Sequence, residues 1–157
     1  MIKIGSPLPT HEFTILTDEG KTTATSEQLF KGKKVVLFAV PGAFTPTCSN
    51  SHLPGFVVQA DRFKARGVDT ICCLSVNDAF VMRAWQQHQN ADAITMLADG
   101  AGSFTQALGL AKDTGEFGGL RAQRFALVAE DGVVTALKIE APGKFEVSDA
   151  ETLLQLV

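Results

Sequence analysis

The chain has 157 residues, of which 45% are hydrophobic and 20% charged, and its formal net charge is -3. This length suits one domain with an apolar core of its own, so residues 1–157 are expected to form a single domain. The basic side chains are scattered rather than clustered, which argues against a nucleic-acid partner. No stretch approaches the roughly 20 apolar residues of a membrane span, so no membrane association is expected.

The cysteine count is odd and low. Three cysteines argue against the disulfide framework of a small secreted protein and favour a reducing compartment. The N-terminus also lacks the apolar core of a signal peptide. We therefore expect a cytoplasmic protein, in which a thiol is inert, metal-bound or catalytic.

The first third of the chain predicts a hairpin, a helical turn and a buried strand. Residues 11–17 resemble a short strand, and the turn at 18–21 predicts a second strand after it. Residues 26–30 have room for one helical turn. The apolar run 35–40 is typical of a strand that is covered on both faces.

After a loop at residues 41–47, the spacing predicts a helix that ends near Gly67. One apolar stripe runs along this helix and comprises Leu53, Phe56, Val57, Ala60 and Phe63. Pro54 lies in its first turns and is expected to distort them, because proline cannot donate to residue 50.

The remaining elements alternate between strand and helix. In chain order they begin with a strand at 68–76, a helix capped by Asn77 or Asp78, a strand at 93–98 and a helix at 103–108. A hairpin of strands 122–129 and 133–139 follows, with its turn at Glu130-Asp131-Gly132. The last element is a helix at 149–156, with Leu153, Leu154 and Leu156 inward. This order predicts an α/β fold with a central mixed sheet, helices on both faces and an N-terminal hairpin. The natural interpretation is a thioredoxin-like fold.

Cys48 occupies the place where that fold carries its chemistry, the loop-to-helix junction after the first central strand. A thiol attacks only as thiolate, and both the free N–H groups of a helix N-terminus and a nearby arginine favour that form. The preceding loop is stiffened by Pro41 and Pro46, and Thr45 can turn its hydroxyl toward the sulfur. Such a site suits attack on a peroxide oxygen, with fixed donors stabilising the departing oxygen. A buried, inert thiol is the alternative.

These residues resemble a known signature. The segment Pro41-Gly-Ala-Phe-Thr-Pro-Thr-Cys48-Ser49 is similar to the P-x3-T-x2-C motif of peroxiredoxins. The flanking segments His52–Phe56 and Leu74–Phe80, together with Arg124-Phe125 and Glu130-Asp131-Gly132, resemble the atypical type II (class-five) branch. The likeness runs from about residue 3 to the end of the chain.

The resemblance implies a thioredoxin-like fold and the reduction of hydrogen peroxide and alkyl hydroperoxides without a metal or an organic cofactor. By position, Cys48 is the peroxidatic cysteine, Thr45 its hydrogen-bonding partner, Pro41 its shield and Arg124 the activating arginine. The strand period puts Arg124 on one face with Ala126 and Val128. Arg121 lies only three residues away, and a surface position is the alternative for Arg124.

Two other roles for these residues are weaker. His52 follows Cys48 by four residues and could act as the base of a hydrolase, but Pro54 disturbs the helix and no orienting Asn or Asp is near in sequence. A metal site would need Cys48, His52 and the Cys72-Cys73 pair. Adjacent strand residues point to opposite faces, so too few ligands remain for zinc.

A second thiol must resolve the sulfenic acid that peroxide leaves on Cys48. Cys72 and Cys73 both read as core residues of a buried strand. Cys73 matches the position of a second cysteine in some plant relatives and is the better candidate for a resolving cysteine. The C-terminal third has no cysteine, in contrast to animal relatives. We therefore expect a one-cysteine cycle in which glutathione with glutaredoxin, or thioredoxin, supplies the second thiol.

Relatives of this branch commonly form homodimers, and three phenylalanines near the site suggest a contact patch: Phe44, Phe80 and Phe117. Each of them could equally belong to the core. The competing functional class is a thioredoxin-fold redox sensor or adaptor that relays oxidation to a partner protein. Such a protein needs a reactive cysteine but neither Thr45 nor an arginine.

Overall fold

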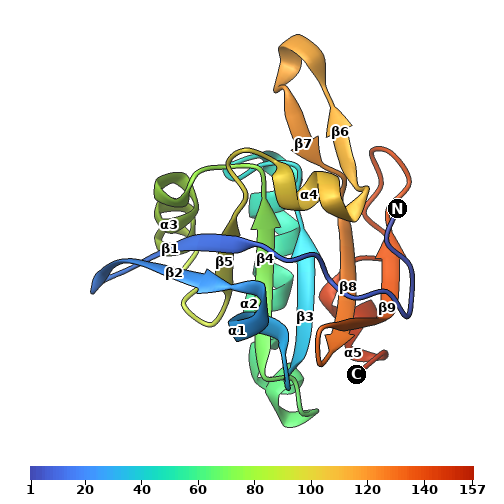
Figure 1. The fold of residues 1–157 in the computed structure, drawn as a ribbon. Helices are drawn as coiled ribbons and strands as arrows, with labels where there is room; N and C mark the ends of the chain where they lie inside the picture. The colour runs from blue at the N-terminus through green and yellow to red at the C-terminus, as the bar shows by residue number, and fades with distance from the viewer.

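The centre of the structure, a computed structural model that describes residues 1–157, is a five-stranded mixed sheet (Figure 1). In spatial order the strands are β5 (Thr95–Ala98), β4 (Thr70–Ser75), β3 (Lys34–Ala39), β8 (Phe125–Glu130) and β9 (Val133–Ile139). β3 lies in the middle, parallel to β4 and antiparallel to β8. The sheet therefore brings the segment before Cys48 next to the segment that follows Arg124.

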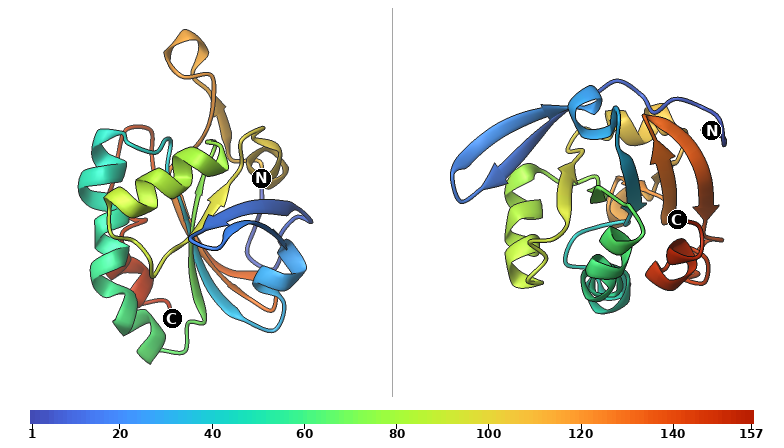
Figure 2. Two further views of the ribbon diagram at one scale, coloured as in Figure 1. Left: turned by 90° about the vertical axis from the view of Figure 1, so that its left-hand side faces the viewer. Right: turned by 90° about the horizontal axis from the view of Figure 1, so that it is seen from below.

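Helices cover both faces of this sheet, as the sequence predicted (Figure 2). One face carries α2 (Leu53–Ala65), α3 (Ala79–His88) and α5 (Ala150–Leu154). The other carries α1 (Ser26–Phe30), α4 (Ser103–Leu108) and the N-terminal hairpin of β1 (Glu12–Thr17) and β2 (Gly20–Thr25). This arrangement confirms the thioredoxin-like fold. No helix is long and apolar enough to cross a membrane.

The core has two halves because side chains alternate across each strand. Phe38, Cys73 and Ala126 face the α2 side, together with Cys48. Their strand neighbours Leu37, Cys72 and Leu127 face the side of the N-terminal hairpin. The expected division of β8 into two faces is confirmed. The same alternation along β4 places Cys72 and Cys73 in different halves of the core.

The helix that carries Cys48 begins irregularly, as expected from the position of Pro54 in its first turns. Residues Cys48–His52 form a π-helical turn, and α2 follows with Pro54 in its first turn. The N–H of Leu53 donates to the carbonyl of Cys48, five residues back, which is the π-helical register. A proline is tolerated here because the first turn of a helix does not require its missing donor.

Two expectations about the C-terminal half are wrong. The expected strand at 122–129 is divided, because Ala122 ends a small separate hairpin of β6 (Ala111–Asp113) and β7 (Leu120–Ala122), joined around a 3-10 turn at Gly115–Phe117. These strands have three residues each, too few to show a period. Leu156 is 40% exposed, because α5 ends at Leu154 and its periodicity does not continue.

Candidate active site

Cys48 lies at the first position of the π-helical turn, and its side chain is fully buried on the α2 side of the core. The backbone N–H of Ser49 donates to the carbonyl of Thr45 at 2.9 Å, so the loop and the turn are continuous. The indole Nε1 of Trp85 on α3 donates to Ser49 Oγ at 3.0 Å. These contacts hold the backbone around the sulfur from two sides.

The arginine that reaches the sulfur is Arg124. Its Nη2 donates to Cys48 Sγ at 3.2 Å. This contact follows from the sheet, because Phe125 pairs with Ala39 and so sets Arg124 beside the Cys48 loop. Arg121 instead lies over the ring of Phe117, 5.3 Å from its centre. A guanidinium at hydrogen-bond distance stabilises negative charge on the sulfur and therefore favours the reactive thiolate.

His52 holds that arginine in place. The Nη1 of Arg124 and His52 Nδ1 are 2.9 Å apart, and His52 Nε2 is 2.9 Å from the carbonyl oxygen of Ser148. The carbonyl can only accept, so Nε2–H donates to it and Nδ1 accepts from the arginine. Burial, and then the charge of Arg124, lower the pKa of His52 from 6.5 to about 3. The imidazole is therefore neutral at physiological pH.

This role of His52 was missed in the sequence, where it was considered only as a hydrolase-type base or as a metal ligand. Both ring nitrogens are occupied, so no base is free. The available signal was its position four residues after Cys48, which puts the two side chains on one face.

Glu140, at the end of β9, organises the loop that supplies the Ser148 carbonyl. The buried carboxylate accepts from the N–H groups of Glu146, Val147 and Ser148, and from Ser148 Oγ at 2.7 Å. Burial alone would raise the pKa of Glu140, but these hydrogen bonds outweigh it and lower the pKa below 4.5. Sequence reasoning did not find Glu140, because its partners come from an irregular loop.

Thr45 and Pro41 belong to the loop that precedes Cys48. The Oγ1 of Thr45 donates to the carbonyl of Gly42 at 2.6 Å, so its proton is held within the loop. This carbonyl lies three residues back in the same loop. With its proton engaged, the hydroxyl oxygen has lone pairs left to accept from a bound molecule. Pro41 lines the adjoining pocket together with Arg124.

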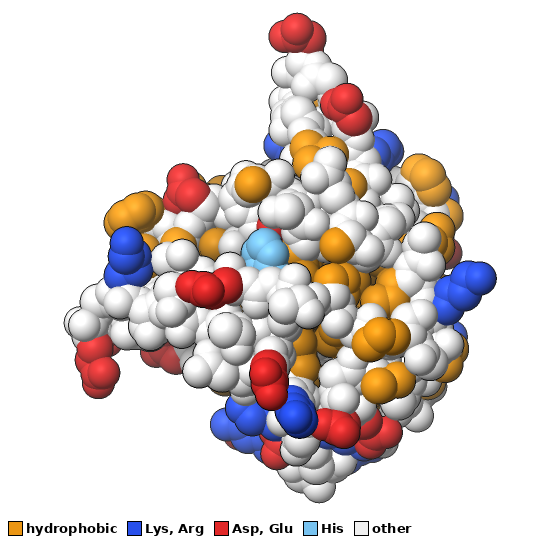
Figure 3. All heavy atoms as spheres, in the orientation of Figure 1, with side chains coloured by type: hydrophobic (Ala, Val, Ile, Leu, Met, Phe, Trp, Pro, Cys, Tyr) orange, Lys and Arg blue, Asp and Glu red, His pale blue; other side chains and the backbone are white.

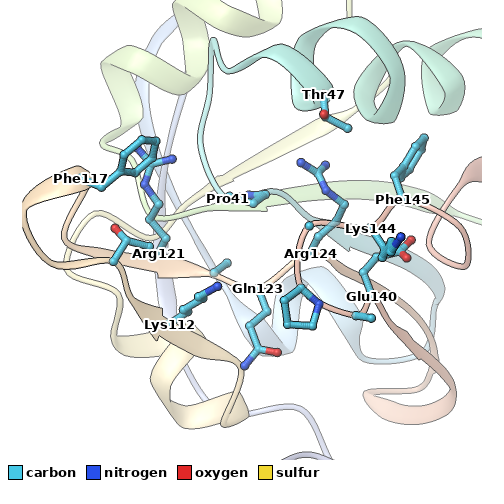
Figure 4. A pocket seen from close by; sticks show the side chains of 15 residues that line it. Pro41, Thr47, Lys112, Phe117, Arg121, Gln123, Arg124, Glu140, Lys144 and Phe145 are labelled. Carbon is cyan, nitrogen blue, oxygen red and sulfur yellow. The ribbon is translucent and has the colours of Figure 1, made fainter.

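That pocket has a volume of about 420 Å³. Figure 4 shows Arg124 rising from its floor toward the helical segment that carries Thr47, with Phe145 on one side. The Cζ of Arg124 lies 5.8 Å from the centre of the Phe145 ring. The pocket is therefore lined by the arginine that also contacts the Cys48 sulfur and His52.

The other two cysteines are free and fully buried. Burial raises the pKa of Cys72 to about 12, although Lys33 opposes the shift. Burial, and then the neighbouring thiols of Cys48 and Cys72, raise the pKa of Cys73 well above its ordinary value. Cys73 shares the core half of Cys48, whereas Cys72 lies across the sheet.

The three phenylalanines named from the sequence are all outside the core. Phe44, Phe80 and Phe117 are 52%, 73% and 83% exposed. Phe44 has a positive φ of 61° and lies against Trp85 and His88 of α3, with ring centres 6.5 and 5.8 Å apart. They are distributed over the Cys48 loop, α3 and the β6–β7 hairpin.

A thioredoxin-like sheet with a buried cysteine in the first turn of a helix and an arginine on its sulfur defines a thiol-based redox protein. The comparisons agree with this class. A family model described as Redoxin matches residues 3–154. Peroxiredoxin-2C of Oryza sativa subsp. japonica is 48% identical, over 98% of this chain and 97% of the relative.

The solved structures lead to the same family. Reduced Prx3 from Vibrio vulnificus, in complex with H2O2, is 60% identical with a TM-score of 0.96, over 99% of both chains. Peroxiredoxin 5 from Alvinella pompejana is 33% identical with a TM-score of 0.86, over 99% of this chain and 97% of that one. The chain belongs to the peroxiredoxins, in their type II branch, and is a thiol-dependent peroxidase.

Proposed function

We propose that Cys48 is the peroxidatic nucleophile of this enzyme. Its thiolate attacks one oxygen of a hydroperoxide ROOH, an S–O bond forms as the O–O bond breaks, and Cys48–SOH and RO⁻ result. The alkoxide takes a proton and leaves as ROH. The observation that supports this assignment most directly is the 3.2 Å contact between Arg124 Nη2 and Cys48 Sγ.

Arg124 has a second task in this proposal. Charge moves from sulfur to the departing oxygen as the O–O bond breaks, and a fixed guanidinium donor at that place stabilises the transition state. Thr45 Oγ1 accepts from the hydroperoxide proton, because its own proton is held by Gly42. Pro41 shields the sulfur from bulk water on the pocket side.

The cycle then uses an external thiol. Cys48–SOH and RSH give Cys48–S–S–R and water, and a second RSH releases the reduced enzyme and RSSR. Cys73 is the internal alternative, but burial raises the pKa of its thiol, which keeps it protonated and a poor nucleophile. We therefore assign a one-cysteine cycle with glutathione and glutaredoxin, or thioredoxin, as reductant.

The substrates in this proposal are hydrogen peroxide and alkyl hydroperoxides, in antioxidant defence and cell redox homeostasis. The Prx3 structure from Vibrio vulnificus, determined in complex with H2O2, supports the first of them. Homodimers form through Phe44, Phe80 and Phe117, whose rings are exposed. The cytoplasm is the proposed compartment, since three cysteines, an odd and low count, do not suit the disulfide framework of a secreted protein.

One experiment tests these assignments together. Peroxide consumption is followed under excess glutathione with glutaredoxin, and separately with thioredoxin, for the wild type, Cys48→Ser and Cys73→Ala. We expect loss of turnover in Cys48→Ser, by about 10³-fold or more, because the nucleophile is missing. Cys73→Ala retains activity within about 2-fold.

Two results would contradict the proposal. A single stoichiometric oxidation of the wild type would make the chain a redox sensor. Mass spectrometry of peroxide-treated wild type that finds a Cys48–Cys73 disulfide in high yield would replace the one-cysteine cycle.

A further inference from the structure

The pocket beside the active site concentrates positive charge on a chain whose net charge is negative. Four of its lining side chains are cationic: Lys112, Arg121, Arg124 and Lys144. The chain as a whole has a formal net charge of -3. Figure 4 shows these side chains around one hollow, with Lys112 and Arg121 from the β6–β7 hairpin and Lys144 from the loop after β9.

None of these four cations has a carboxylate partner within 4.0 Å, since all five salt bridges of the structure involve other residues. The only acidic side chain in the lining is Glu140. Its oxygens are already engaged by the N–H groups of Glu146, Val147 and Ser148 and by Ser148 Oγ. The pocket therefore carries an excess of positive charge, with four cationic side chains against one carboxylate.

The β6–β7 hairpin gives a second, independent indication. Lys112 and Arg121 are directly opposite each other in its register, and like charges at such a pair destabilise a two-stranded ladder. The acidic residues of this hairpin, Asp113 and Glu116, do not line the pocket, and acidic side chains stand at its projecting tip (Figure 3). An anion bound between the two cations would remove their repulsion.

We propose that this pocket is a carboxylate-recognition site, with Lys112, Arg121 and Lys144 as specificity-determining residues. The inference rests on the proposed function, because a carboxylate held there directs the rest of a small molecule toward Arg124 and the Cys48 sulfur. A volume of about 420 Å³ accommodates a molecule of tripeptide size. The rings of Phe117 and Phe145 offer apolar contact to its uncharged part.

This chemistry has two sources in the catalytic cycle. The carboxylate belongs either to the thiol that reduces Cys48–SOH or to an organic hydroperoxide that oxidises Cys48. In both cases the reaction at the Cys48 sulfur is that of the proposed peroxidase cycle. The pocket affects only which thiol or hydroperoxide reaches the sulfur. Focused positive charge raises such encounter rates by about 10- to 1,000-fold, and salt screens the effect.

The test reverses two pocket charges in the full-length protein and measures each half-reaction alone. Lys112→Glu/Lys144→Glu is compared with the wild type and with Lys3→Glu/Lys21→Glu. Lys3 and Lys21 are exposed and outside the pocket, so the control makes the same change in net charge. The reduction arm uses glutathione and 2-mercaptoethanol on preformed Cys48–SOH. The oxidation arm uses tert-butyl hydroperoxide and a tert-alkyl hydroperoxide with a terminal carboxylate.

We expect the pocket variant to lose about 10-fold or more in rate with the carboxylate-bearing member of at least one arm. The neutral member of the same arm changes by less than about 3-fold, and the loss shrinks at high salt. The arm that responds identifies the source. Equal changes for charged and neutral members in both arms, or the same losses in the control variant, would overturn the proposal. If the wild type forms no Cys48–SOH with hydrogen peroxide, the peroxidatic assignment fails instead.

Discussion

Cys48 and Cys73 lie in the same half of the core and are equally buried, yet their surroundings differ in kind. Cys48 Sγ accepts a hydrogen bond from Arg124 at 3.2 Å. Cys73 lies in the middle of β4, paired with Phe38, and burial raises the pKa of its thiol. Burial by itself suppresses a thiolate, whereas a charged donor at the sulfur opposes this effect.

The difference extends to the residues behind each sulfur. Arg124 is held by His52, which is held by the Ser148 carbonyl, and Glu140 fixes the loop that presents it. Cys73 belongs to the same apolar cluster as Cys48, but its sulfur has no such hydrogen bond. In this chain the two sulfurs therefore differ in their polar contacts and not in their packing.

Among the changes that leave the Cys48 nucleophile in place, the largest effect is expected from removing the cation of Arg124. Arg124→Ala should slow peroxide attack on Cys48 by about 100-fold or more, because one fixed donor to the developing charge is lost. The single tryptophan, Trp85, is hydrogen-bonded to Ser49, so stopped-flow fluorescence follows the oxidation directly. Arg124→Lys is the matched control, which keeps the charge but not the fork that contacts both Cys48 and His52. An unchanged rate in Arg124→Ala would remove it from the mechanism.

A smaller effect is expected at the loop. Thr45→Val keeps the shape of the side chain but removes its oxygen, and should slow peroxide attack by about 10- to 100-fold. Thr45→Ser restores the oxygen and should recover most of the rate in the same stopped-flow assay. Equal rates for Thr45→Val and the wild type would mean that the hydroxyl serves only its 2.6 Å bond to Gly42.

The last expected effect is on the free energy of unfolding and not on rate, and it is gradual in pH. The pKa of His52 is about 3 in the folded protein and 6.5 without its surroundings, so the unfolded chain binds the extra proton first. Between pH 6.5 and pH 3 the titration of His52 lowers the free energy of unfolding by about 1.4 kcal/mol for each unit by which the pH falls. Above pH 6.5 the imidazole is neutral in both states, and this loss is absent.

His52→Asn lacks this titration and keeps an acceptor for Arg124. Urea unfolding from pH 7 to pH 4.5 should therefore show the wild type losing its advantage over His52→Asn as the pH falls. Glu140, whose pKa is lowered, adds a loss in the same direction to both proteins and cancels in the difference. Parallel pH profiles would show that His52 is not held neutral.

The sequence alone determined the elements with strong local signals. The apolar run before the loop became β3, Asp78 and Asp149 cap their helices, and Asp131-Gly132 forms the predicted tight turn. The placement of Cys48 at a helix start also followed from local pattern. The β6–β7 hairpin did not, because three-residue strands carry no period and are held by Thr114 Oγ1, which donates to the Gly119 carbonyl.

The surroundings of Cys48 were decided only by tertiary structure. The site combines segments up to 100 residues apart on the chain, and it comprises Cys48, His52, Arg124, Glu140 and Ser148. Their contacts depend on the pairing of β3 with β8. The strand period predicted which face of the sheet Arg124 lies on. Whether its guanidinium lies within hydrogen-bond distance of the sulfur depends on how the strands pair. The same holds for the pocket, whose cations are scattered in sequence and gathered by folding.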